Sequence, residues 1–207
     1  TTTQGLTSAL NTYGLDYKTN QGDGAFYGPK IDVHIKDALG RTWQCGTIQL
    51  DMSLPERFNL SYIDKNNEKR RPIMIHRVIY GSIERFFGIL IEHFAGNFPL
   101  WMAPVQTVIL PINDDLVTYS NNIKIKLETA GLRTEVDRRT ESLNKKVRDA
   151  QLNKIPLILT IGNKEKESGN LSVRTLDGKV RFGVAHEEFL AKSLSHIRER
   201  KLDLEIF

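Results

Sequence analysis

Residues 30–50 read KIDVHIKDALGRTWQCGTIQL, and this stretch decides the fold of the first half of the chain. Apolar and polar residues alternate over residues 30–38, which is the period of a half-buried strand. Leu39 and Gly40 supply a turn, and residues 41–50 read as a second strand rich in Trp, Thr and Ile. The stretch therefore predicts an antiparallel hairpin.

Further elements flank this hairpin on both sides. Residues 1–15 carry apolar residues three and four apart and predict the tail of a helix that ends at Gly14. Residues 72–75 predict a third strand, and Gly81 is expected to open a second helix. The apolar positions of this helix, spaced by three and four, are Ile79, Ile83, Phe86, Phe87, Leu90 and Phe94.

The second half alternates strands with helices. Two prolines in NFPLWMAP, residues 97–104, indicate a domain boundary, and we expect domains over residues 1–102 and 103–207. The β-α-β-α-β order predicts a small parallel-type sheet with helices on its faces. We therefore expect an α/β protein whose first half is α+β, with an antiparallel sheet. The expected elements are strands 105–111, 132–137 and 156–162, helices 116–130, 142–152 and 187–200, and a hairpin of 171–175 with 179–182.

Composition excludes several classes of protein. A single cysteine, Cys45, excludes an internal disulfide framework and a Cys-rich zinc module. The net charge of +4 over 207 residues permits a polyanionic partner without requiring one. No apolar run approaches the roughly 18 residues of a membrane span, so we expect no membrane partner. Because the chain starts without Met and inside a helical pattern, we expect it to be part of a longer protein.

A glycine-rich loop precedes the first strand. Residues 22–30 read GDGAFYGPK, a tight loop that could bring Tyr27 and Lys30 to a ligand. Lys30 would then serve as a compact cation for a carboxylate or a phosphate. A plain hairpin turn is an equally good interpretation of the glycines and the proline.

The second strand carries an unusual polar cluster. Strict alternation places Gln44, Gly46, Ile48 and Leu50 on one face and Trp43, Cys45, Thr47, Gln49 and Asp51 on the other. Buried amides and hydroxyls need partners, which a small polar ligand or a network of neighbouring side chains can supply. Cys45 alone is more typical of a small core residue than of a nucleophile.

A third segment, residues 76–88, reads HRVIYGSIERFFG. Gly81, Arg85 and Gly88 would share one helix face, leaving an open shelf beside a guanidinium that suits a phosphate or an aromatic base. The alternative is close helix packing at the glycines, with Arg85 paired to an acid. His76 alone does not argue for zinc, because a zinc site needs three or four ligands.

These three segments, in this order, resemble the C-terminal half of the catalytic domain of the threonyl-tRNA synthetases. The G-S-x-E-R sequence at residues 81–85 matches the third signature motif of class II synthetases. The second half resembles the anticodon-binding domain of the threonyl, prolyl, histidyl and glycyl subgroup. The resemblance implies a ligase that activates threonine with ATP and Mg²⁺ and transfers it to tRNA(Thr) in protein biosynthesis.

The resemblance also implies roles for individual residues. Arg85 and Lys30 would be catalytic, and Gln44, Ser82 and Arg85 would bind ATP. Tyr27, Lys30, Thr47 and Gln49 would line the threonine and adenylate pocket. Thr140, Arg148, Glu165 and Arg174 match positions that contact anticodon bases, and Thr140 stands where an Asn is usual.

His76 matches one zinc ligand of the family, and the resemblance places the other ligands before residue 1. A metal that requires a hydroxyl ligand would reject valine strongly, whereas an apolar pocket separates such isosteres only about 10²-fold. We expect residues 1–207 alone neither to bind zinc tightly nor to activate threonine.

Two other functions remain open from the sequence. One is a prolyl or seryl relative, against which the Cys-Gly-Thr-x-Gln strand and His76 argue. The other is a non-catalytic, synthetase-like accessory subunit, which the presence of Arg85, Gln49 and His76 disfavours. The family implies a homodimer. The abundance of Lys, Asn and Ile favours the mitochondrial matrix, with a cytoplasmic location as the alternative.

Overall fold

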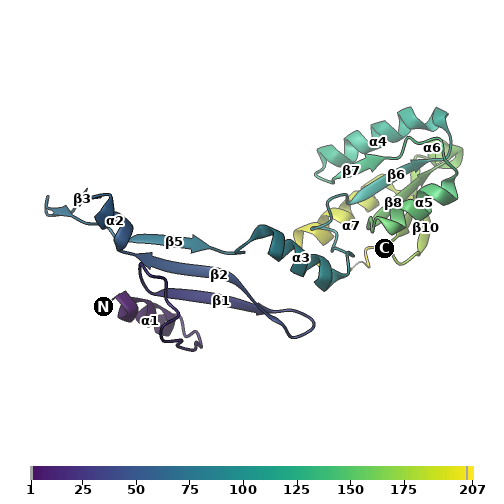
Figure 1. Ribbon diagram of the computed structural model, residues 1–207. Coiled ribbons are helices and arrows are strands. Elements are labelled where there is room, and N and C mark those ends of the chain that lie inside the picture. The colour runs from purple at the N-terminus through teal and green to yellow at the C-terminus, as the bar shows by residue number, and fades with distance from the viewer. Residues whose placement is uncertain (1, 204) are drawn as a thin grey trace. The chain divides into compact units, whose positions relative to one another are not determined.

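A computed structural model describes residues 2–203 and 205–207 of the chain (Figure 1). The chain divides into two compact units, with the division between His93 and Phe94. Each unit has its own sheet. In the described part of the chain, no helix is both long and apolar enough to cross a membrane.

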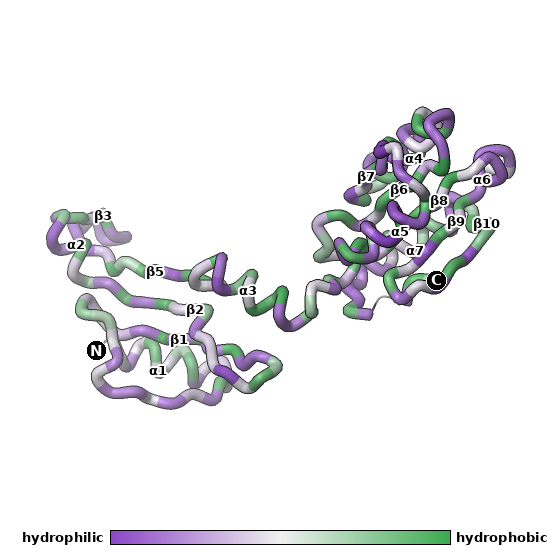
Figure 2. The backbone as a smooth tube through the Cα atoms, turned by 45° about the vertical axis from the view of Figure 1, so that its right-hand side comes forward, coloured by the Kyte–Doolittle hydropathy of each residue, from purple (hydrophilic) through white to green (hydrophobic). Residues whose placement is uncertain are grey.

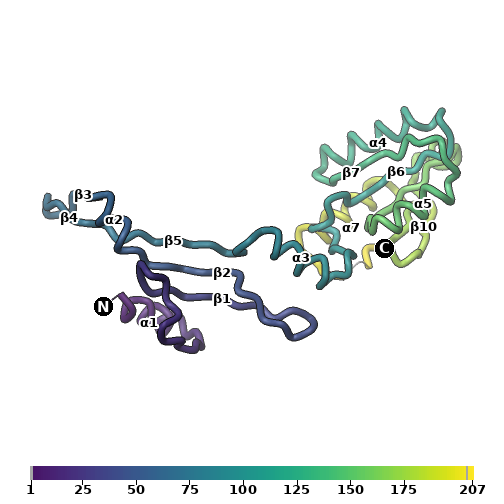
Figure 3. The backbone as a smooth tube through the Cα atoms, viewed as in Figure 1, coloured from purple at the N-terminus to yellow at the C-terminus, as the bar shows by residue number. Residues whose placement is uncertain are grey.

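The first unit is built on a three-stranded antiparallel sheet of order β1-β2-β5. A separate pair of short strands, β3 and β4, forms a small two-stranded sheet (Figure 3). The elements of this unit are α1 (Thr2–Thr12), β1 (Lys30–Lys36), β2 (Thr42–Asp51), α2 (Ser53–Arg57), β3 (Tyr62–Ile63), β4 (Lys69–Arg70), β5 (Met74–Val78) and α3 (Ile83–Phe94).

The predicted hairpin is confirmed, since β1 pairs antiparallel with β2 along the whole length of β1. Two boundaries differ from the prediction. The third strand occupies Met74–Val78 rather than residues 72–75, because Pro72 has no N–H to donate to a ladder. Helix α3 begins at Ile83, because Gly81 has a left-handed backbone with φ of 67°.

A β-bulge changes the faces of β2. Val33 pairs with Gly46, but the next residue of β1, His34, pairs with Gln44, so Cys45 is an extra residue in β2. Alternation therefore shifts by one position at Cys45. The prediction that Gln44 lies on the face opposite Thr47 is wrong: the bulge brings Gln44 and Thr47 to the same face.

Few side chains of the first unit are buried. Cys45 and Ile89 are its only buried apolar residues apart from Pro55 among those the structure describes. The apolar face expected for α3 is only half-buried at Phe86, Leu90 and Phe94, and it is exposed at Ile83 and Phe87. Other large apolar side chains exposed in this unit include Tyr13, Phe26, Phe58, Ile63, Ile75 and Tyr80.

The second unit is a five-stranded mixed sheet of order β10-β9-β8-β6-β7. Strand β6 pairs in parallel with both β7 and β8, whereas β9 and β10 are antiparallel additions. The elements are β6 (Thr107–Pro111), a short 3₁₀ turn (Asp114–Leu116), α4 (Val117–Thr129), β7 (Thr134–Val136), α5 (Leu143–Leu152), β8 (Leu157–Ile161), α6 (Asn163–Ser168), β9 (Asn170–Thr175), β10 (Val180–Ala185) and α7 (His186–Arg198).

Helices cover both faces of this sheet. On one face Ile123 and Leu127 of α4 and Phe189 of α7 pack with Ile109 and Leu159 of the strands. On the other face Ala150 of α5 packs with Val108, Leu110 and Ile158. The hydrophobic colouring of β6 and β8 in Figure 2 follows from their burial on both sides.

The α/β class and the β-α-β-α-β order are confirmed in this unit, with each predicted strand and helix found near its expected bounds. Helix α6 was not predicted, because its six residues, NKEKES, are too few and too polar to show an apolar period. The expected division at residues 102 and 103 stays a prediction.

Candidate functional site

A polar row crosses the three strands of the first unit. Lys30 of β1 lies opposite Gln49 of β2, and Gln49 lies opposite His76 of β5. Residues directly opposite in neighbouring strands point to the same face, so the three side chains form one line across the sheet. Thr47 and Asp51 lie two residues away from Gln49 along β2 and share this face.

One end of the row is an ion pair. The Lys30 ammonium lies 2.8 Å from Oδ2 of Asp32, and the Gln44 amide donates to Oδ1 of the same carboxylate at 2.6 Å. Burial would raise the pKa of Asp32, but Lys30, with Thr47 and Gln44, holds that pKa below its ordinary value. The hydrogen bond from Lys30 to Asp32 also raises the pKa of Lys30, so the pair is charged at neutral pH.

The other end of the row is held by Asp51. Its side chain is fully buried, and Oδ2 lies 2.8 Å from Nε2 of His76. Its other oxygen accepts from the backbone N–H groups of Ser53 at 2.8 Å and Leu54 at 3.0 Å, at the start of α2. Burial would raise the pKa of Asp51, but His76 and these two N–H groups bring the pKa below its ordinary value. Asp51 therefore fixes the orientation of the His76 ring.

The glycine-rich loop delivers Tyr27 to the middle of the row. The Tyr27 hydroxyl donates to Oε1 of Gln49, and its ring packs edge-on against His76 with centroids 5.7 Å apart. The loop can approach this closely because Gly28 has no side chain: a Cβ there would lie 2.0 Å from the carbonyl oxygen of Leu50. The interpretation of residues 22–30 as a loop that presents Tyr27 and Lys30 fits this geometry better than a plain turn.

Arg85 and Ser82 lie outside this cluster. The Ser82 hydroxyl donates to Glu84 at 2.7 Å and accepts weakly from the Arg85 backbone N–H at 3.4 Å, at the start of α3. Among the described residues, the Arg85 guanidinium has no ion-pair partner, so the alternative in which Arg85 pairs with an acid is not found. The expected shelf is also wrong at Gly81, which precedes the helix and packs against the carbonyl of Cys45.

The first unit does not by itself form a zinc site. No group of three or more His, Cys, Asp or Glu side chains in the described residues could hold a metal ion. His76 and Asp51 offer one imidazole and one carboxylate, fewer than the three protein ligands of a catalytic zinc. Cys45 is buried and is the extra residue of the bulge. The residues present therefore do not fit a zinc ion on their own.

The four residues matched to anticodon contacts lie at two places in the second unit. Thr140 is exposed in the loop after β7, and Glu165 lies after β8, so both are at the carboxyl edge of the parallel strands. Arg148 is exposed on α5. Arg174 pairs with Ile158, which α5 covers, so it lies on the α5 face toward the other end of β8.

Two of these four residues already have partners within the chain. Glu165 accepts from the backbone N–H of Gly162 at 3.0 Å and caps α6. Arg174 donates to the carbonyl of Gly178 at 3.2 Å in the β9–β10 turn. Thr140 and Arg148 are the more open positions. The structural roles of Glu165 and Arg174 leave their outer atoms free to meet a ligand as well.

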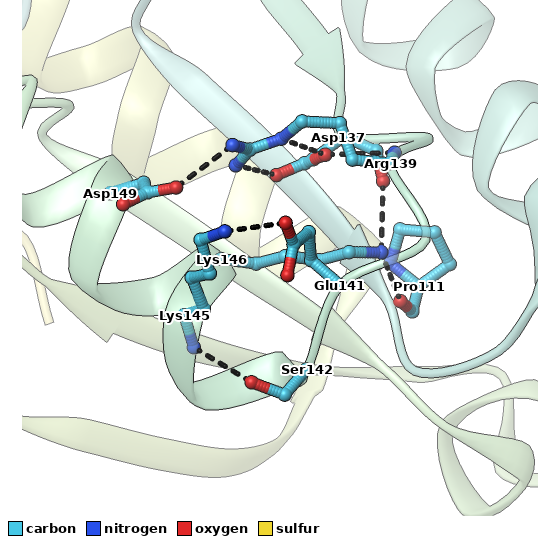
Figure 4. Close-up of polar contacts among 8 residues, drawn as sticks. All are labelled: Pro111, Asp137, Arg139, Glu141, Ser142, Lys145, Lys146 and Asp149. Atoms are coloured by element: carbon cyan, nitrogen blue, oxygen red, sulfur yellow. Dashed lines mark hydrogen bonds and ion pairs between the residues drawn. The ribbon is translucent and has the colours of Figure 1, made fainter.

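Sequence reasoning missed several residues of both sites. Asp32 and Asp51 hold the ends of the polar row: alternation placed Asp51 on that face without giving it a role, and the alternation of β1 could have placed Asp32 there. In the second unit, Arg139 joins Asp137 and Asp149 beside Thr140 (Figure 4). Nothing in the sequence pattern distinguishes Arg139 from an ordinary surface charge.

Comparison with known proteins decides the family. A family described as the tRNA synthetase class II core domain (G, H, P, S and T) matches residues 3–94, and one described as the anticodon binding domain matches residues 106–196. Over 99% of its length the chain is 69% identical to the threonine–tRNA ligase of Desulforapulum autotrophicum. The chain is a homologue of the threonine–tRNA ligases.

Further threonine–tRNA ligases are also similar to this chain. The one from Desulfosudis oleivorans is 70% identical over 96% of the chain. A solved RNA-binding domain of threonyl-tRNA synthetase from Cryptosporidium parvum is 40% identical, with a TM-score of 0.78, and the match covers 92% of this chain and 48% of that one. The chain spans about a third of the curated threonine–tRNA ligases, 32% and 31% for the two named here. The resemblance stated from the sequence is confirmed at the level of the family.

Proposed function

We propose that this chain is the part of a threonine–tRNA ligase that contributes one side of the amino-acid pocket and the anticodon-binding domain. The whole protein would activate threonine with ATP and transfer it to tRNA(Thr). The observation that carries the proposal is 69% identity to a threonine–tRNA ligase across 99% of the chain. The polar row Lys30–Gln49–His76, which that chemistry can use, supports it.

The polar row suits a small zwitterion and its adenylate. The Lys30 ammonium has three donors, so it can pair with Asp32 and still donate to a carboxylate or a phosphate. The amide of Gln49 and the hydroxyl of Tyr27 offer hydrogen bonds of fixed direction. The buried hydroxyl of Thr47 helps to lower the pKa of Asp32 but makes no hydrogen bond of normal geometry in the described residues, which is unusual for a buried polar atom. In the proposal these side chains hold threonine and orient its carboxylate for attack on ATP.

ATP is assigned to the second group of residues. Gln44, Ser82 and Arg85 would bind the nucleotide, with Mg²⁺ carried on its phosphates as the family generally requires. The Arg85 guanidinium would stabilise the charge that develops on the leaving pyrophosphate. A guanidinium with no carboxylate partner in the described residues is suited to that role, because an ion pair would compete with the phosphate.

Zinc belongs to the same proposal with one ligand from this chain. Nε2 of His76 is engaged by Asp51, which leaves Nδ1 for a metal and gives the ring the carboxylate partner that metal-bound histidines commonly have. The remaining ligands are not among the described residues, so His76 would hold the metal only together with another part of the protein.

Amino-acid-dependent ATP–pyrophosphate exchange tests the proposal on the full-length gene product. Threonine, serine, valine and proline are compared, with and without a zinc chelator. We expect exchange with threonine, none with valine, and loss of exchange on chelation. Proline-dependent exchange would instead identify a prolyl relative. No exchange with any amino acid, in a folded protein, would favour the non-catalytic accessory subunit.

The 207-residue chain provides a second test. Because the described residues do not form a complete zinc site, we expect this chain alone to show no threonine-dependent exchange. Measurable exchange by it would refute that expectation. A homodimer and a mitochondrial location also belong to the proposal, and the mass of the full-length protein in solution and its distribution between cell fractions test them.

A further inference from the structure

The sheet of the second unit opens at one point along its carboxyl edge. After β6 the chain crosses to α4 on one face of the sheet, and after the neighbouring strand β7 it crosses to α5 on the other face. Adjacent parallel strands whose connections leave in opposite directions create a crevice at their carboxyl ends, which is where ligands of open α/β sheets bind.

Lys146 of α5 occupies this crevice. Its ammonium donates to the carbonyl of Pro111, at the end of β6, at 3.2 Å, and to the carbonyl of Asp137, just after β7, at 3.3 Å. Figure 4 shows the side chain reaching between these two backbone segments. The residue as a whole is 5% exposed, which is rare for a lysine.

This burial is costly and needs an explanation. A buried ammonium loses its hydration, and an apolar side chain of similar volume commonly serves stability at least as well. An apolar side chain would, however, leave the two carbonyls unlinked. The Asp137 N–H already donates to the Ile109 carbonyl at 3.0 Å, and the ammonium adds a second link between the two segments by joining the carbonyls of Pro111 and Asp137.

The loop above the crevice carries Thr140. Its first residue, Asp137, is held on both sides: Lys146 binds its backbone carbonyl, and Arg139 binds its carboxylate at 2.7 Å. Arg139 also reaches Asp149 of α5 at 2.8 Å, which ties the loop to the helix (Figure 4). Thr140 follows immediately and is exposed.

We propose that Lys146 is a positioning residue for base reading: it locks the carboxyl ends of β6 and β7 so that the Thr140 loop stands at one fixed place over the crevice. The inference rests on the proposed anticodon binding of this unit. Lys146 is buried, so its own charge does not meet RNA phosphates, and its effect is on the geometry of the loop alone.

The test compares two RNA hairpins that differ only in loop sequence. One has the sequence of the tRNA(Thr) anticodon arm, the other has the same stem with a permuted loop, and both are fluorescein-labelled. The 207-residue chain and its variants are titrated against each in an anisotropy assay at fixed salt. The discrimination is the ratio of the two dissociation constants.

For Lys146→Met we expect a loss of discrimination of about tenfold, the size of one base contact, with binding of the permuted hairpin unchanged. Lys146→Arg keeps the positive charge and has enough N–H donors for both carbonyls, so it is expected to lose less discrimination than Lys146→Met. Lys124→Met is the matched control for the loss of one lysine, because Lys124 pairs with Glu128 on the surface of α4. It should leave the discrimination unchanged.

Leu127→Ala controls for simple destabilisation. Leu127 is buried on the α4 face, on the opposite side of the sheet from α5, so its truncation lowers the melting temperature without touching the loop. Should Lys146→Met lack a native melting transition, Lys146→Gln becomes the deciding variant, since its amide is too short to join both carbonyls. It is expected to fold and to lose discrimination.

The outcomes separate the inference from the function on which it rests. Full discrimination by folded Lys146→Met or Lys146→Gln overturns the positioning role alone. An equal loss in Leu127→Ala also overturns it, because loss of stability would then explain the effect. Equal binding of both hairpins by the wild-type chain overturns the proposed anticodon reading, and the positioning role falls with it.

Discussion

Gly28 occupies a position that leaves no room for a side chain. Its backbone lies against β2, and the neighbouring Pro29 carbonyl accepts the N–H of Leu50 at 3.1 Å. This close approach places the Tyr27 hydroxyl at Gln49 and the Lys30 ammonium at Asp32. Gly28 is therefore required for the close approach of two backbone segments and not for the geometry of a turn.

We predict that Gly28→Ala weakens this contact by about 1–3 kcal/mol, the usual cost of an added methyl group that cannot be accommodated. The Cβ would lie 2.0 Å from a backbone oxygen, which no rotamer change can relieve. Hydrogen exchange of the Leu50 amide should quicken about tenfold or more. Gly5→Ala on α1, where a Cβ meets nothing within 4 Å, is the control and should leave this exchange rate as it was.

At the scale of elements, the β1–β2 hairpin is closed by one carboxylate. Asp37 accepts the backbone N–H groups of Leu39 and Arg41, each at 2.9 Å, and the indole N–H of Trp43 at 2.8 Å. The Trp43 hydrogen bond is the main cause that lowers the pKa of Asp37 to about 2, and Arg41 acts in the same direction. This turn explains why the hairpin register starts where it does.

The lowered pKa of Asp37 predicts how the stability of this turn changes with pH. A carboxyl whose folded pKa lies below its unfolded value stabilises the turn above the unfolded pKa and loses that effect as the pH falls through the folded one. Asp37→Asn should therefore lower the exchange protection of the Leu39 and Arg41 amides at pH 6, and the difference from wild type should disappear between about pH 4 and pH 2.

Amides of another turn provide the internal control for Asp37→Asn. The N–H groups of Asn66 and Glu68 donate to Asp64, so their protection should be the same in both proteins. A constant difference between wild type and variant across the whole pH range would show that the charge of Asp37 has no part in holding the turn.

The hairpin and the strand–helix alternation were predictable because both follow from periods in the sequence. The face of Gln44 was not, because counting by two along β2 cannot detect the extra residue at Cys45. The start of α3 was misplaced for a related reason, since Gly81 continues the helical spacing but packs in a left-handed conformation against β2. The pattern predicts which elements exist, and tertiary packing decides where each begins.

In the candidate site, too, some features follow from sequence periods and others depend on tertiary packing. The common face of Thr47, Gln49 and Asp51 followed from alternation, and their partners on β1 and β5 needed the strand register. Arg85 could be singled out by its motif, but its distance from the polar row depends on how the segment before α3 turns. Lys146 carried no signal in the sequence, since a buried lysine and an exposed one look alike there.

At the scale of the whole chain, the two units differ in how much apolar surface they bury. The second unit has two continuous cores on the two faces of its sheet. The described residues of the first unit leave large side chains such as Phe26, Ile75 and Phe87 more than half exposed. Stability in the chain is therefore concentrated in the second unit.

We predict that residues 94–207, expressed separately, unfold in one cooperative transition in urea and bind little of the dye ANS. Residues 1–93 should bind ANS strongly and unfold without a sharp transition, because little apolar area becomes newly exposed. Circular dichroism and ANS fluorescence on the two fragments check this. A cooperative, ANS-silent fragment 1–93 would contradict the assignment of stability to the second unit.

The bulge at Cys45 has a consequence for anyone who transplants or redesigns this hairpin. The alternation of side chains between the two faces of β2 is regular before Cys45 and regular after it, but it shifts by one position at Cys45. Replacing Cys45 keeps the extra residue, whereas deleting it would give a regular ladder in which Gln44 still lies opposite His34, on the face of Asp32. A designer must therefore assign faces separately on the two sides of Cys45, because a count by two that includes this residue puts Gln44 on the wrong face.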